Sequence, residues 1–302
     1  MTLDADFNPP VGVAETLAPG LRRILAPNPS PMTWRGTNTY IIGQGRVAVI
    51  DPGPENRNHF DAIMAATKGE VIDLILVTHS HTDHSPLSRP LGEATTAPVM
   101  AYGDSQAGRS EVMQDLVARG MTGGGEGIDA AFLPDHCLRD GETVVGPDWT
   151  LQAIWTPGHM ANHLCFAWGD ALFVGDHVMG WASSLVSPPD GDLTQFMASC
   201  ARLAARKDAV YHSGHGAPIT NPAERIQWLI NHRKTREAQI LSAMGDGPAS
   251  ASELTNSVYS DTPTAMLPAA QRNVLAHLID LTGRKVIRPC GSLNQSSTFI
   301  RI

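Results

Sequence analysis

The chain of 302 residues lacks the features that mark membrane, secreted and disulfide-bonded proteins. No apolar run approaches the ~18 residues that a bilayer-spanning helix needs, so no membrane partner is expected. Residues 1–7 lack the basic and apolar regions of a signal peptide, which predicts a soluble, cytoplasmic protein. The four cysteines form no CxxC pair, which argues against a cysteine zinc site or a disulfide framework and predicts reduced, mostly buried thiols.

Charge is sparse and unevenly spread. Charged residues make up 17% of the chain and hydrophobic residues 42%, which is the composition of a globular protein with a sizeable core. The net charge of −8 disfavours a protein that coats nucleic acid by bulk electrostatics, although it permits a local cationic site. From residue 221 onward nine Lys and Arg outnumber six Asp and Glu, whereas residues 1–220 hold 13 basic and 24 acidic side chains. The split predicts two regions, 1–220 and 221–302, with different surface roles.

Apolar runs predict a series of strands in the first region. Residues 39–42 and 47–50 flank a glycine-containing turn and predict a hairpin that ends at Asp51. Residues 71–77 form a nearly continuous apolar run, typical of a strand buried on both faces. The same reasoning predicts a helix over 59–68 and strands over 98–102, 149–155, 163–168, 171–174 and 209–212.

Residues able to bind metal follow four of these strands. The strand over 71–77 leads directly into the cluster His79-x-His81-x-Asp83-His84, in which four donor side chains fall within six positions. Imidazole nitrogens and carboxylate oxygens bind zinc at ~2.0–2.2 Å, and one loop can send alternate side chains to one ion and the next two to its neighbour. Because sites are normally built from loops at one rim of a sheet, we expect these residues to meet. The later strands end before His159, Asp176 and His215.

Taken singly, these three residues also fit a turn, a strand-end cap and a surface loop. Together with the cluster they supply five histidines and two aspartates, enough to hold two divalent ions with Asp176 between them. The imidazole-rich set favours zinc, and iron or manganese also fit such donors.

The second region reads as helical with a short β-like tail. Asn221 fits a helix N-cap, Pro222 the first helical position and Glu224 a reciprocal capping residue, for a helix that runs to about residue 244. Residues 245–248 read as a linker. Helical stretches over 252–259 and 269–281, followed by β-like segments over 283–288 and 297–301, resemble a small winged-helix domain.

The ordered set of Asp51, the His79–His84 cluster, His159, Asp176 and His215 resembles the metallo-β-lactamase superfamily over about residues 35–220. The resemblance implies an α/β fold, a four-layer αββα sandwich with a dinuclear site at one edge of two facing sheets. A small, mostly helical, winged-helix-like domain follows it. The resemblance also implies ligand roles: His79, His81 and His159 hold one metal, and Asp83, His84 and His215 hold the other, with Asp176 bridging.

The same resemblance implies which residues take part in catalysis. Asp83 acts as a ligand and catalytic carboxylate, and Asp51 orients a ligand from behind the metals rather than binding metal itself. His177 adjoins Asp176 and is a candidate for proton transfer. A hydroxide held by the two metals would attack an electrophilic carbonyl or phosphorus, because such a pair lowers the pKa of shared water to near 7.

Within the superfamily the chain is most similar to the branch called lactamase-beta-like protein 2, through residues 228–240 and into the tail. Asp176 stands near the point where true β-lactamases use a cysteine, and His81 stands where flavodiiron relatives need a glutamate. Known members of the branch include endoribonucleases selective for single-stranded RNA. The resemblance therefore implies a metal-dependent hydrolase outside the β-lactamases, acting on single-stranded RNA or on a small molecule.

Two other functions stay open. A thioesterase of the glyoxalase II kind shares Thr156-Pro-Gly-His159 and the metal ligands, although the tail shows no Arg/Lys signature for glutathione. A nucleic-acid-binding regulator with a structural metal would use the basic, winged-helix-like tail, but structural zinc sites are usually closed four-ligand cages. Turnover of S-lactoylglutathione and a gel shift with duplex DNA distinguish these two. The oligomeric state is left open.

Overall fold

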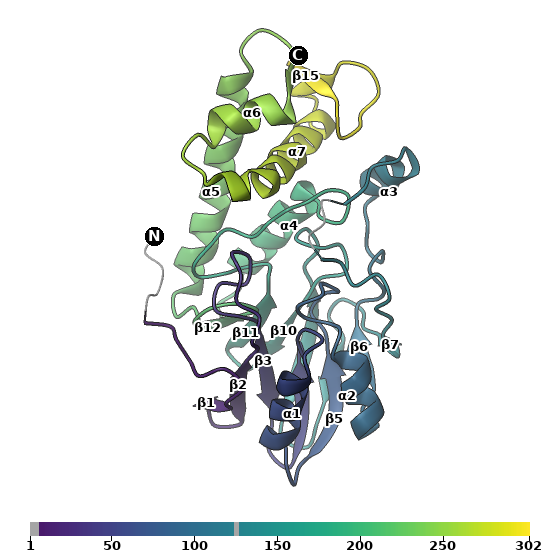
Figure 1. Ribbon diagram of the computed structural model, residues 1–302, viewed down its shortest axis with the longest axis vertical. Helices are drawn as coiled ribbons and strands as arrows, with labels where there is room; N and C mark the ends of the chain where they lie inside the picture. Colours follow the sequence, from purple (N-terminus) through teal and green to yellow (C-terminus); the bar gives the residue numbers. More distant parts are fainter. Residues whose placement is uncertain (1–5, 124–126) are drawn as a thin grey trace.

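Two facing β-sheets form the body of the protein in the computed structural model, which describes residues 6–123 and 127–302 (Figure 1). The first sheet follows chain order, and β4–β5, β5–β6 and β6–β7 are parallel pairs, whereas β1 to β4 are antiparallel. Its strands are β1 (Glu15–Ala18), β2 (Leu21–Leu25), β3 (Asn38–Ile42), β4 (Arg46–Ile50), β5 (Val71–Leu76), β6 (Val99–Ala101) and β7 (His136–Cys137).

The second sheet has the order β12-β11-β10-β9-β8, in which only β11 and β12 run parallel. Its inner face packs on the first sheet, and large side chains such as Trp149, Phe166 and Phe173 join Tyr40 of β3 in the core between the sheets. The strands of the second sheet are β8 (Thr143–Val145), β9 (Thr150–Trp155), β10 (Leu164–Trp168), β11 (Ala171–Gly175) and β12 (Val210–Ser213). Strands such as β3 and β11 are buried on both faces, which explains their mostly apolar runs.

Helices cover the outer faces and complete the predicted αββα sandwich. Helices α1 (Arg57–Ala66) and α2 (Ser88–Thr95) lie on the first sheet, where Ile63 and Leu91 join the apolar layer. On the second sheet, α4 (Leu193–Ala204) and the start of a long helix, α5 (Pro222–Met244), pack through their apolar faces. Helix α3 (Glu111–Ala118) lies away from both sheets, beside the C-terminal region (Figure 1).

The C-terminal region contains the predicted helices and a small sheet of order β13-β15-β14. Helix α5 connects it to the sandwich: Ile226 and Leu229 belong to the core beneath the second sheet, and Ile240 and Met244 to the C-terminal core. The elements are β13 (Ala249–Ser250), α6 (Ala251–Val258), η1 (Thr264–Met266), α7 (Leu267–Gly283), β14 (Ile287–Pro289) and β15 (Thr298–Arg301).

Some local predictions need correction. Asn221 is the N-cap of α5 and Pro222 follows it, but the Asn221 side chain makes no capping hydrogen bond, so the predicted reciprocal cap with Glu224 is wrong. A capping box does form at α6, between Ser250 and Glu253. All four cysteines are free, but only Cys165 and Cys200 are buried, whereas Cys137 and Cys290 are exposed, so the prediction of mostly buried thiols holds for two of the four. Among residues 6–123 and 127–302, no helix is long and apolar enough to span a bilayer.

Candidate metal centre

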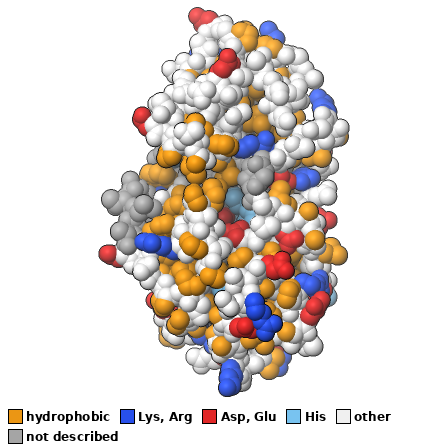
Figure 2. Space-filling view, in the orientation of Figure 1, with side chains coloured by type: hydrophobic (Ala, Val, Ile, Leu, Met, Phe, Trp, Pro, Cys, Tyr) orange, Lys and Arg blue, Asp and Glu red, His pale blue; other side chains and the backbone are white. Residues whose placement is uncertain are grey.

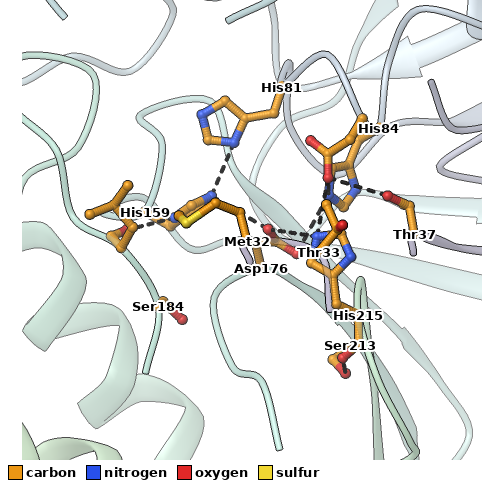
Figure 3. Close-up of polar contacts among 12 residues, drawn as sticks. Met32, Thr33, Thr37, His81, His84, His159, Asp176, Ser184, Ser213 and His215 are labelled. Carbon is orange, nitrogen blue, oxygen red and sulfur yellow. Dashed lines mark hydrogen bonds and ion pairs between the residues drawn. The ribbon is translucent and has the colours of Figure 1, made fainter. Parts of the chain in front are cut away.

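The predicted ligands meet where four strands end at one edge of the sandwich. The loop after β5 carries His79, His81, Asp83 and His84, and the ends of β9, β11 and β12 bring the others. In Figure 3 the labelled ligands point towards one shared space. Their donor atoms fall into two groups, in each of which all the atoms lie within 4.8 Å of one another. The groups are His79, His81 and His159, and Asp83, His84, Asp176 and His215.

The three-histidine group is compact. The Nδ1 atom of His81 lies 2.9 Å from Nε2 of His79 and 3.1 Å from Nε2 of His159. Burial lowers the pKa of all three imidazoles, and that of His81 falls to about 3. The rings are therefore neutral at pH 7, and a neutral imidazole is the form that binds a cation.

Carboxylates dominate the second group. Nε2 of His215 lies 3.1 Å from Asp83 Oδ2 and 3.2 Å from Asp176 Oδ2. Asp176 also reaches the first group, because its Oδ2 is 3.8 Å from His159 Nε2. Asp176 thus lies between the two groups, in the position predicted for a bridging ligand.

The charges in the second group are strongly coupled. Burial alone would raise the pKa of the Asp83 and Asp176 carboxyls, but His84 and His215 hold both well below their usual range. For His215 burial acts in the opposite sense and alone would lower the pKa, but Asp176 and Asp83 raise it to about 10. Two buried carboxylates therefore attract positive charge, which a proton or a metal ion can supply.

Hydrogen bonds on the far side of the rings orient the ligands. Nδ1 of His159 donates to the Leu185 carbonyl at 2.7 Å, and Nδ1 of His215 donates to the Gly36 carbonyl at 3.0 Å. A proton held at Nδ1 leaves the Nε2 lone pair directed into the cluster. Backbone carbonyls thus set the orientation of the His159 and His215 rings.

Asp51 supports one histidine of each group through hydrogen bonds. Its Oδ2 accepts from His84 Nδ1 at 3.0 Å and from Thr78 Oγ1 at 2.8 Å, while its Oδ1 accepts from the Thr78 amide at 2.7 Å. Thr78 Oγ1 in turn lies 2.9 Å from Nδ1 of His79. One buried carboxylate therefore orients His84 directly and His79 through Thr78.

The donor set fits a pair of divalent ions. Nε2 of His84 and Oδ1 of Asp176 are buried and make no hydrogen bond among the described residues, and they lie 3.5 Å from each other. Both belong to residues of the four-residue group, where a cation would supply the partner that buried polar atoms require. Imidazole and carboxylate donors suit zinc, iron and manganese.

A cavity of about 510 Å³ lies over the ligands and is mostly apolar. Figure 2 shows hydrophobic side chains around an opening at whose base histidine and acidic side chains are visible. Arg272 is the one lysine or arginine among the lining residues that the structure describes, and it bonds Ser187 Oγ and the Thr122 carbonyl. The apolar lining residues are Pro31, Met32, Met179, Leu185, Ala265, Met266, Pro268 and Ala269.

The C-terminal helices hold the loop that orients His159. Asn273 Oδ1 of α7 accepts from the Val186 amide at 3.0 Å and from Arg233 Nη1 of α5 at 2.9 Å. Arg233, buried with 2% exposure, also donates to the Ser184 carbonyl. Leu185, whose carbonyl accepts from His159, lies between these two anchored residues.

His177 lies apart from the cavity. The ring is fully buried against Phe196, with centroids 4.4 Å apart, and its Nε2 is 3.5 Å from Cys200 Sγ. Burial lowers its pKa to about 3. The proton transfer that we predicted for His177 requires access to the cavity, which this position does not provide.

Apart from Asp51 and the ligands themselves, sequence reasoning missed the residues that line the cavity and support the ligands. Thr78 was visible only as the residue before His79, and Thr37, whose hydroxyl donates to Asp83 at 3.2 Å, had no local signal. Asn273 and Arg233 sit on helices more than fifty positions from any ligand they affect. No spacing rule connects such residues to the site.

The family comparison agrees with this geometry. The model of the metallo-beta-lactamase superfamily matches residues 32–215, and that of the beta-lactamase associated winged helix domain matches residues 250–288. The chain therefore belongs to the metallo-beta-lactamase superfamily, and its His/Asp site is that of a metal-dependent hydrolase of this superfamily. The predicted fold and family are confirmed.

Individual relatives resemble the whole chain. A "Beta-lactamase-like protein 2 homolog" of Drosophila melanogaster is 30% identical over 90% of this chain and 91% of its own length. An "Atrochrysone carboxyl ACP thioesterase" of Aspergillus fumigatus is 27% identical over 84% of this chain and 78% of its own. The crystal structure of a metallo-beta-lactamase family protein from Thermus thermophilus covers 95% of this chain and 100% of its own, with a TM-score of 0.75 and 26% identity.

Proposed function

We propose that the protein hydrolyses thioesters of uncharged, apolar acyl groups with the help of two divalent ions, zinc being the first choice for these donors. The observation that carries the proposal is the mostly apolar lining of the cavity over the ligands, with Arg272 as its one lysine or arginine among the described residues. A polyanionic RNA strand needs a cationic groove, which this lining does not supply. Curated relatives named as acyl carrier protein thioesterases support the same bond type.

The ligand roles follow from the two groups. His79, His81 and His159 would hold one ion, and Asp83, His84 and His215 the other, with Asp176 between them. When bound, such a pair of ions polarises a carbonyl oxygen and supplies a nucleophile at neutral pH.

The chain's own residues orient and enclose these groups. Asp51 fixes His84 and, through Thr78, His79. The apolar side chains of the cavity exclude water from the acyl group, which strengthens the electrostatic interactions beneath it. The cavity opens to solvent above the ligands, which suits a substrate better than the closed cage of a structural zinc site.

The test is turnover of a butyryl thioester of N-acetylcysteamine by the zinc-loaded protein, beside the Asp83→Ala variant. We expect turnover by the wild type and its loss in the variant, because Asp83 belongs to the four-residue group. S-lactoylglutathione serves as the polar comparison, and we expect it to be hydrolysed more slowly. Equal rates of butyryl hydrolysis in wild type and variant would refute the proposal.

RNA cleavage is the second candidate, because one feature favours it. A pocket of about 580 Å³ beside the His215 loop is lined by Trp34, Trp181 and Trp228, and indole rings stack on unpaired bases. Gly216, next to His215, packs against Trp34 and Trp181. A labelled single-stranded RNA assay with wild type, Asp83→Ala and Trp228→Ala tests this candidate, and cleavage that is equal in all three proteins would exclude it.

A further inference from the structure

A second, smaller cavity adjoins the one over the metal ligands. It has a volume of about 230 Å³ and lies between the 179–185 loop and the segment that runs from the C-cap of α6 into α7. We call it the side gallery, and define it by Trp181, Ala182, Ser183, Tyr259, Thr262, Ala270 and Asn273. Six further residues line both cavities: Pro31, Met32, Met179, Leu185, Met266 and Ala269.

The lining of the side gallery is uncharged. No Asp, Glu, Lys, Arg or His lines it in the part of the chain that the structure describes. Asn273, one of its polar residues, already uses its Oδ1 atom on the Val186 amide and Arg233. Most of the remaining lining consists of Ala, Pro, Leu and Met side chains and the rings of Trp181 and Tyr259, which suits an apolar occupant.

The residues that line both cavities place the side gallery next to the cavity over the metal ligands. Met32, Met179 and Met266 stand between it and the ligand cavity, and methionine side chains adapt their shape to an apolar guest. Leu185 belongs to the same wall, and its carbonyl accepts from the ligand His159. A substrate whose carbonyl lies at the metal centre can therefore extend its tail past the methionines into the side gallery.

We propose that the side gallery binds the distal part of the acyl chain, and thereby makes this protein selective for medium-length or phenyl-bearing acyl groups. This proposal rests on the proposed thioester hydrolysis. An engineered cavity of ~150 Å³ binds benzene, so the larger side gallery accommodates an acyl tail of about six carbons or a phenyl ring. Because Tyr259, at the C-cap of α6, and Ala270 of α7 line the side gallery, the C-terminal region takes part in substrate selection.

The first experiment measures kcat/KM of the full-length, zinc-loaded protein on N-acetylcysteamine thioesters from acetyl to octanoyl. Each buried methylene contributes about fourfold, so we expect a rise of roughly two-hundredfold from acetyl to hexanoyl, followed by a plateau. Ala270→Leu and Ser183→Leu place added methyl groups in the side gallery and should collapse the hexanoyl-to-acetyl ratio. Ala238→Leu makes the same change as the former on an exposed position of α5 and should behave as wild type.

Two variants are needed because Ala270 is buried, whereas Ser183 is partly exposed and tolerates a larger side chain better. A thermal melt of each variant reports whether it folds. The side gallery proposal is overturned if wild type hydrolyses thioesters of all chain lengths equally well. It is also overturned if Ala270→Leu and Ser183→Leu both fold and keep the wild-type chain-length preference. In either case the proposed function stands.

A binding measurement tests the side gallery even if the protein hydrolyses no thioester. Calorimetry with non-hydrolysable ketone analogues, in which a methylene replaces the thioester sulfur, reports chain-length preference without turnover. If wild type hydrolyses no thioester, the proposed function fails. The binding part of the side gallery proposal is then supported if the hexanoyl analogue binds more tightly than the acetyl analogue and Ser183→Leu removes the difference, and it is overturned if the analogues bind alike.

Discussion

Asn273 is the residue through which the C-terminal region should control one metal site. Replacing Asn273 by Ala removes the acceptor of the Val186 amide, which is buried, and one partner of the Arg233 guanidinium. A buried donor left without a partner costs about 1–3 kcal/mol, and a charged one costs more. We therefore expect Asn273→Ala to lower the free energy of unfolding by about 3 kcal/mol.

The same substitution should weaken metal binding selectively. Without its anchor the 184–186 loop no longer fixes the Leu185 carbonyl, which holds His159 in position at 2.7 Å. Loss of such supporting hydrogen bonds typically lowers metal affinity about 10–100-fold. Because His159 belongs only to the three-histidine group, one of two bound ions should weaken while the other is retained.

Competition of zinc-loaded protein with a chromophoric chelator measures both affinities in one titration. Asn273→Asp keeps an oxygen acceptor for both donors and should restore most of the affinity. Asp280→Ala is the matched control, because Asp280 lies on the same helix and bonds Thr194 and Arg284 away from the loop. Two equally weakened sites, or unchanged sites in a destabilised Asn273→Ala protein, would refute the reasoning.

Three further predictions concern the centre itself. Asp51→Asn removes the charge that orients His84, and zinc affinity should fall about 10–100-fold in the same titration. Gly214→Ala would push a methyl group against Asp176 Oδ1 and to 2.7 Å from His84 Cε1. Elemental analysis of this variant should therefore find a lower metal content than in the wild type. Gly247→Ala is its control, because a methyl group at that position meets nothing within 4 Å. Removing zinc with EDTA should lower Tm, because a ligand at a hundred times its Kd stabilises by about 2.7 kcal/mol; an unchanged Tm would show that no ion binds the folded protein.

Several elements were predictable because their signals are local. The runs at 71–77 and 171–174 are strands, since a strand covered on both faces must be apolar throughout. The helix starting at Pro222 and its N-cap at Asn221 were predictable from local signals, but the reciprocal cap with Glu224 was wrong, because the Asn221 side chain makes no capping hydrogen bond. The division at residues 220 and 221 stays a prediction, since α5 contributes to the cores on both sides of it.

The donor residues were evident from the chain alone because each follows a strand, and strand ends can be read from hydrophobic pattern. What surrounds them was decided only in three dimensions. Met32, Leu185 and Met266 meet over the ligands although more than seventy positions separate each from the next, and no periodicity records that meeting. The donor types that set the metal chemistry thus follow from local patterns at four strand ends, whereas the shape and polarity of the substrate cavity arise from packing between distant segments.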